Sequence, residues 1–196
     1  MIKHFEVLLK AYTRLEDITP LKYDCGELCG ALCCHDNGND GETLGMWLLP
    51  FERELLEALT KDDGITEYTY GKAEDGTETV FCNGRCDRRW RPFACRIYPF
   101  YPLILKDNDG RTRIKVRRDP RARFSCPIAM KDSYLRPDIE FVAAVKSAVR
   151  ELLKDEEIAK DLISMSDFLY EIEEMQEKLI GDRKIFKKSY KIPVSY

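Results

Sequence analysis

The crowding of cysteines is the feature that most constrains what this chain can fold into. Eight cysteines occur in 196 residues, and the segment CGELCGALCC holds four of them, at Cys25, Cys29, Cys33 and Cys34. The segment CNGRCDRRWRPFAC holds three more, and the last cysteine follows at Cys126. In a reducing compartment, clustered cysteines are typical of metal or redox chemistry and not of a disulfide framework.

The first segment of the chain indicates such a compartment. MIKHFEVLLKAYTRLEDI has charges at Lys3, Glu6 and Lys10, which interrupt the apolar region that a secretory signal needs. Its apolar residues recur at helical spacing, so we predict an amphipathic helix. No stretch of the sequence approaches the roughly 18 apolar residues of a membrane span. We therefore expect a cytoplasmic protein with no membrane partner.

The first group of cysteines does not suit a regular helix. A straight helix would separate Cys25 from Cys33 by about 12 Å, too far for one zinc ion with Zn–S bonds of roughly 2.3 Å. The glycines at 26 and 30 would also weaken a helix, so we expect a looping segment. Neighbouring side chains usually diverge, so one of Cys33 and Cys34 would join Cys25 and Cys29, and the other would serve a second centre or be structural. His35 is either a fourth ligand or a loop residue.

The later cysteines form a second set of four, Cys82, Cys86, Cys95 and Cys126. The two sets could hold one centre, two centres, or ligands shared between the sets. Each arrangement would join segments about 100 residues apart, and metal binding would then contribute to folding.

Several arginines surround the second set, and among them Arg91 and Arg96 are the expected cofactor-binding residues. Their charge would stabilise an anionic metal–sulfur centre and lower the pKa of nearby thiols. The expected ligands are numerous, all of them are sulfur, and arginines are close to them in the sequence. These features favour an iron–sulfur cluster, with zinc as the alternative.

Alternating and helical patterns predict the remaining elements. Alternating residues on either side of the turn sequences EDG and DNDG predict two β-hairpins. Apolar stripes predict further helices. The second helix would carry Pro50 in its first turn, and Gly181 would end the last one. The predicted hairpins lie within residues 65–82 and 101–118, and the predicted helices cover 48–61, 141–152 and 158–179.

The expected fold class is therefore α+β. We expect small β-hairpins around a cysteine-rich metal centre, with N- and C-terminal helices packed outside. Residues 1–136 would form the cysteine-cluster metal-binding domain, and residues 137–196 would form a helical C-terminal extension packed on it.

The charges are unevenly distributed along the chain. Residues 85–123 carry thirteen Lys and Arg against four Asp and Glu, whereas residues 138–178 carry twelve acidic residues against five basic ones. These two regions could attract each other or serve different partners. The basic stretch 111–123 allows a nucleic-acid-binding module as an alternative function, but the sequence does not favour it because the spacing of zinc-finger ligands is absent.

The two groups of cysteines together resemble the YkgJ-like cysteine-cluster family, described as a zinc- or iron-chelating domain. The family pattern has closely spaced cysteines ending in a doublet, then a pair of cysteines, then RPxxCRxxP, and here these elements are CGELCGALCC, CNGRC and RPFACRIYP. LGMWLLPFERELL also resembles the segment that follows the doublet. The resemblance spans roughly residues 23 to 130 and implies metal binding by the matching positions: Cys25, Cys29, Cys33, Cys34, Cys82, Cys86, Cys95 and Cys126, with Arg91, Pro92, Arg96 and Pro99.

The same resemblance implies an alternative function. The family is similar to flagellin lysine N-methylases, which share this cysteine core and are associated with an iron–sulfur cluster. A protein-lysine N-methyltransferase would use S-adenosylmethionine and a protein substrate. The residues alone show no glycine-rich fingerprint of a methyl-donor pocket and single out no catalytic residue.

Overall fold

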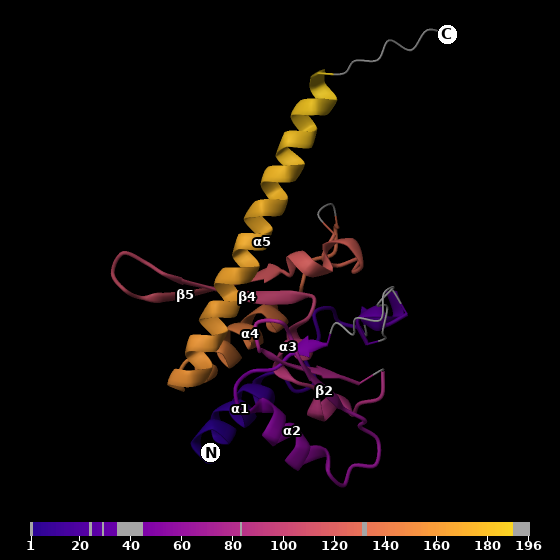
Figure 1. The fold of residues 1–196 in the computed structure, drawn as a ribbon, viewed down its shortest axis with the longest axis vertical. Coiled ribbons are helices and arrows are strands. Elements are labelled where there is room, and N and C mark those ends of the chain that lie inside the picture. The colour runs from indigo at the N-terminus through magenta and orange to yellow at the C-terminus, as the bar shows by residue number, and fades with distance from the viewer. Residues whose placement is uncertain are drawn as a thin grey trace.

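A computed structural model describes residues 2–23, 25–28, 30–34, 45–82, 84–130 and 133–189, with the side chains at 25, 26, 32 and 180–189 outside that description. The fold is α+β, as the sequence predicts, with helices packed around two small antiparallel sheets (Figure 1). No helix in these ranges has the length and apolar character needed to cross a membrane. The helices are α1 (Ile2–Arg14), α2 (Glu52–Thr60), α3 (Phe93–Ile97), α4 (Ile139–Leu152) and α5 (Glu156–Ser189).

Both predicted hairpins are present. The first consists of β2 (Thr69–Lys72) and β3 (Glu78–Phe81), and the short strand β1 (Met46–Trp47) adds to the other edge of β3. The second consists of β4 (Phe100–Lys106) and β5 (Thr112–Arg118), paired in register from Phe100 opposite Arg118 to Lys106 opposite Thr112. Every residue of β4 from Phe100 to Ile104 is buried, because α4 and α5 pack against this sheet.

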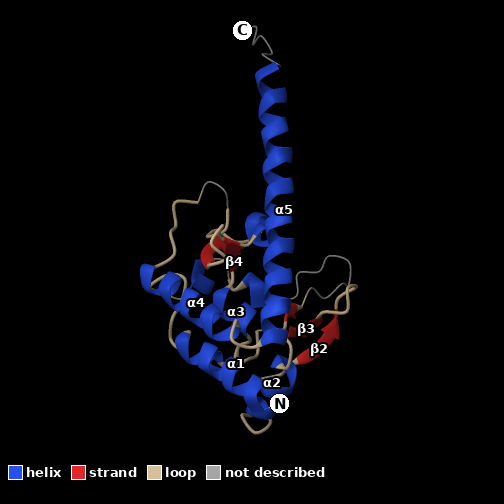
Figure 2. Cartoon of the chain, turned by 90° about the vertical axis from the view of Figure 1, so that its left-hand side faces the viewer, coloured by secondary structure: helices blue, strands red, loops and turns tan. Residues whose placement is uncertain are grey.

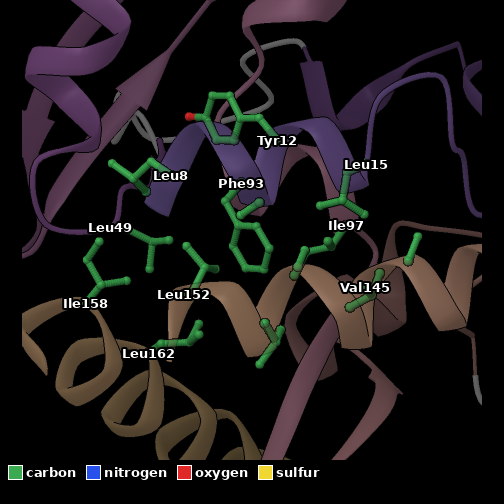
Figure 3. Close-up of a cluster of buried hydrophobic side chains, with 14 of the residues drawn as sticks. Leu8, Tyr12, Leu15, Leu49, Phe93, Ile97, Val145, Leu152, Ile158 and Leu162 are labelled. Carbon is green, nitrogen blue, oxygen red and sulfur yellow. The ribbon is translucent and has the colours of Figure 1, made fainter. Parts of the chain in front are cut away.

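One hydrophobic core joins the two ends of the chain. The apolar face of α1 packs against α4, and α3 and the start of α5 close the cluster (Figures 2 and 3). Residues on both sides of position 136 therefore contribute to the same core. Its labelled members in Figure 3 are Leu8, Tyr12, Leu15, Leu49, Phe93, Ile97, Val145, Leu152, Ile158 and Leu162.

The carboxylate of Glu52 is fully buried at the junction of three elements. Its Oε1 accepts hydrogen bonds from the Tyr12 hydroxyl and the Phe93 backbone N–H, each at 2.6 Å, and its Oε2 accepts from the Leu49 backbone N–H at 2.8 Å. Burial raises the pKa of Glu52, and these three hydrogen bonds oppose that rise. Glu52 thereby ties α1, the start of α2 and the start of α3 together.

Two predicted helix ends are wrong. Pro50 does not lie in the first turn of α2, because Phe51 adopts a left-handed conformation with φ 66° and the helix begins at Glu52. Gly181 does not end α5, which continues to Ser189. A glycine inside a helix costs only about 1 kcal/mol relative to alanine, which neighbouring helix-forming residues can offset.

The basic and acidic regions of the sequence attract each other, one of the two possibilities that their charges allow. Arg117 of β5 pairs with Glu173 of α5 at 2.5 Å, and Arg123 pairs with Glu177 at 2.6 Å. The Tyr101 hydroxyl also donates to Glu173 at 2.9 Å. These contacts fasten α5 along the second hairpin.

Replacing the buried carboxylate tests its role. In Glu52→Gln, the amide nitrogen would face the Leu49 N–H, so one buried donor would lose its acceptor. We expect the free energy of unfolding to fall by about 1–3 kcal/mol in urea denaturation. The exposed Glu54 on the same helix provides the control, since Glu54→Gln should change stability by less than about 0.5 kcal/mol. Equal effects of the two substitutions would contradict the role assigned to Glu52.

Candidate metal centre

The cysteines that the structure describes border one cavity of about 880 Å³. They come from four segments: a 3-10 helix (Leu32–Cys34), the loop after β3, helix α3, and the turn after a 3-10 helix (Pro120–Phe124). The side chain of Cys25, and Cys29 and His35 entirely, lie outside the described residues. The cysteines that border the cavity are Cys33, Cys34, Cys82, Cys86, Cys95 and Cys126.

The adjacent cysteines of the first group do not diverge, contrary to the expectation from the sequence. The Sγ atoms of Cys33 and Cys34 lie 4.0 Å apart, and both residues border the cavity. Both cysteines lie in the 3-10 turn Leu32–Cys34, where the Cys34 N–H donates to the Ala31 carbonyl at 2.7 Å. Thiolates around a tetrahedral zinc ion lie about 3.8 Å apart, so this pair has a separation that one metal could use.

A tight turn brings Cys82 and Cys86 into hydrogen-bond contact. Gly84 between them has φ 75°, the left-handed conformation that the sequence predicts for this turn, and the Arg85 N–H donates to the Cys82 carbonyl at 2.7 Å. The hydrogen bond between the thiols raises the pKa of Cys82 and lowers the pKa of Cys86. Burial opposes the lowering of the Cys86 pKa, whereas a hydrogen bond from Arg91 lowers this pKa further.

Electrostatic effects connect the two groups of cysteines. The pKa of Cys95 is raised first by burial and then by the charges of Cys86 and Cys34, so a residue of the first group lies near two of the second. Burial also raises the pKa of Tyr98, and the charges of Cys126 and Cys33 add to that rise. Segments far apart in the sequence therefore meet at this cavity.

The two arginines expected to bind a cofactor have different surroundings. Arg91 hydrogen-bonds Cys86, yet its Nε is buried and has no hydrogen-bond partner within the described ranges. Arg96 instead supports the backbone: its Nε donates to the Arg91 carbonyl at 2.6 Å, its Nη2 donates to the Arg89 carbonyl, and its guanidinium lies 4.2 Å from the ring centre of Tyr12. An orphaned, buried cationic donor fits an anionic sulfur centre, and Arg91 provides it.

The thiols do not converge on a single point. Among the described residues, no three His, Cys, Asp or Glu side chains stand close enough together to hold a metal ion. The cysteines therefore have the donor chemistry of a metal–sulfur centre, and they border the same cavity. The described side chains do not form a complete ligand shell.

The cavity also has walls that the sequence did not indicate. Trp47 of β1 and Phe168 of α5 border it, with ring centres 5.7 Å apart, and the acidic residues Glu16, Asp17 and Glu27 line another part. Its volume falls within the range of small-molecule sites, roughly 300–1,000 Å³. These residues come from elements that meet only in three dimensions, so no local pattern could identify them.

Comparisons with protein-family models, with curated proteins and with solved structures find no match for this chain.

The lowered pKa of Cys86 predicts selective alkylation of the metal-free protein. Cys86 should retain thiolate at a pH below about 8.5, the ordinary pKa of a thiol, whereas Cys95, whose pKa is raised, should not. Iodoacetamide at pH 7 should then modify Cys86 faster than Cys95, as measured by peptide mass spectrometry. Arg91→Met should slow the reaction of Cys86. Arg85→Met removes the charge of the residue next to Cys86 in the sequence, an arginine that pairs with Glu67 at 3.2 Å, and it should have little effect. Equal rates for Cys86 and Cys95 would refute this prediction.

Proposed function

We propose that this chain is a metalloprotein whose cysteines hold an iron–sulfur cluster, with zinc as the alternative metal, in a structural or redox role. The observation that carries the proposal is the shared cavity, which thiols from four separate segments border. Its support comes from the chemistry of the donors, since thiolates are the ligands that both iron–sulfur clusters and structural zinc sites use.

The surroundings of the thiols favour a cluster over zinc. Arg91 presents a buried Nε without a partner in the described part of the chain, next to Cys86. Sulfide and thiolate sulfurs of a cluster are hydrogen-bond acceptors that such a donor would contact, and hydrogen bonds of this kind tune cluster potentials. When bound, a cluster would supply electron transfer and a covalent link between the segments that border the cavity.

The residues of the chain would control access to such a centre. The Tyr68 hydroxyl donates to the Trp90 carbonyl at 2.9 Å and holds the first hairpin beside Cys82, Cys86 and Cys95, whose charges raise the pKa of Tyr68 after the larger effect of burial. Trp47 and Phe168 close another side of the cavity with apolar surface. A hydrophobic shell of this kind limits the access of water to a metal site.

A second candidate function is protein-lysine N-methylation with S-adenosylmethionine, and two features favour it. The cavity is larger than a metal ion with its ligands needs, which leaves room for a further ligand. Its wall also carries three carboxylates, Glu16, Asp17 and Glu27, which are hydrogen-bond acceptors for a lysine ammonium group, beside five arginines.

Nucleic-acid binding is less well supported, because many of the basic residues from 111 to 123 have acidic partners. Arg113 pairs with Asp107 at 3.3 Å and Arg121 pairs with Asp119 at 2.7 Å, in addition to the two ion pairs with α5. Phosphate groups would have to compete with these carboxylates.

Elemental analysis of anaerobically isolated protein, with an absorption spectrum, tests the proposed metal. We expect iron and acid-labile sulfide in stoichiometric amounts, with broad absorbance at the violet edge of the visible spectrum. A colourless protein with stoichiometric zinc would support the alternative metal, and protein without stoichiometric metal would overturn the proposal.

Single substitutions then test the ligands. Cys86→Ser and Cys95→Ser should each remove most of the bound metal, because each takes away a thiolate ligand. Ser125→Ala, which removes a hydroxyl that borders the same cavity, should retain it. Retention of full metal content by both cysteine variants would exclude these two residues as ligands.

Methyl transfer from labelled S-adenosylmethionine to flagellin-like proteins tests the second candidate function. Label in the substrate that disappears in a Glu16→Gln/Asp17→Asn variant would support it. If the protein with its full metal content transfers no label to the substrate, the methylation proposal fails and the metal proposal is unaffected.

A further inference from the structure

Helix α5 extends well beyond the body of the protein. Its first half packs on β4, where Leu169 contacts Tyr101 and Leu103, and Glu177 forms the ion pair with Arg123. Beyond Glu177 the helix projects away from the other elements in both views (Figures 1 and 2). Most helical stability in proteins comes from tertiary packing, which the projecting part, residues 178–189, lacks in both views. Such a segment gains stability when a partner packs against it.

An apolar stripe runs along α5: Phe168 and Ile172 contact the body, whereas Met175 and Leu179 are exposed. Phe168, Ile172, Met175 and Leu179 follow one another at steps of four, three and four residues, the spacing of a coiled-coil seam. The side chains of Phe168, Met175 and Leu179 are 49%, 60% and 58% exposed. At about 100° per residue, the stripe is centred roughly a quarter of a turn from Leu169, which faces the body.

The charges along this helix change sign. Residues 168–177 contain four glutamates and no basic residue, and two of these glutamates, Glu173 and Glu177, already pair with Arg117 and Arg123 of the body. Residues 178–188 contain five Lys and Arg and one aspartate. Two copies of α5 paired in parallel would place like charges together. Two copies paired antiparallel would place the acidic half of each helix beside the basic half of the other.

We propose that two copies of this chain associate through an antiparallel pairing of α5 over positions 168–186. With the centre at position 177, Met175 of each copy meets Leu179 of the other. Because Phe168 and Ile172 border the cavity, the helix end of each copy would reach the rim of the other copy's cavity.

Sedimentation equilibrium of the full chain over a range of concentrations tests the pairing. The mass should rise with concentration from 22.9 kDa towards twice that value. Met175→Glu/Leu179→Glu should remain monomeric at every concentration. Lys160→Glu, which makes the same change in net charge at an exposed position outside the stripe, should associate like the parent protein. A parent protein that is monomeric throughout, or a dimer that survives the double substitution, would overturn the proposal.

Salt dependence tests the orientation. Attraction between opposite charges is screened by salt, so raising the sodium chloride concentration should weaken an antiparallel dimer. A dimer that salt strengthens would contradict the antiparallel arrangement. The pairing does not depend on the metal, so protein with and without metal should associate alike, and failure of the metal proposal would leave this result unaffected.

Discussion

The buried carboxylate of Glu52 is the interaction on which the arrangement of this protein depends. It accepts hydrogen bonds from Tyr12 in α1, from the backbone before α2 and from the first residue of α3. Helix α3 carries Cys95, and Arg96 one residue later lies over the ring of Tyr12 and hydrogen-bonds the backbone of the preceding arginine segment. The segment that carries the second group of cysteines is thus held against the helical core by buried polar contacts. A carboxylate with three donors in such a site is costly to disturb, because each donor that loses it is left unsatisfied in the protein interior.

A second set of polar contacts positions the opposite side of the cavity. Arg117 of β5 pairs with Glu173, and Arg123 of the 3-10 helix Pro120–Phe124 pairs with Glu177; together they hold the acidic helix against this basic region. This places Phe168 of α5 beside Trp47 of β1 at the cavity wall. Each of these partly exposed ion pairs contributes little to stability by itself, about 0–1 kcal/mol. Their structural effect is to orient a long helix whose far end projects from the body.

Local patterns in the sequence predict much of the fold but only part of the candidate site. The spacing of apolar residues identifies α1 and α4, and the turn sequences identify both hairpins, because these elements depend on neighbours within a few positions. Glu52 could not be recognised as buried, since a glutamate in the first turn of an amphipathic helix ordinarily faces solvent, and its partner Phe93 lies 41 residues away. The proximity of the Cys33 and Cys34 sulfurs depends on side-chain orientations that spacing alone does not indicate. The walls formed by Trp47 and Phe168 likewise arise only when separate elements pack together.

The central claim is that thiols from distant segments share one inorganic centre. X-ray absorption spectroscopy at the metal edge of anaerobically isolated protein tests it most directly, because it reports the type, number and distance of the atoms around the metal. The account predicts a first shell of sulfur at about 2.3 Å, with neighbouring iron atoms in the next shell if the centre is a cluster. A first shell made of oxygen and nitrogen, with no sulfur, would contradict it.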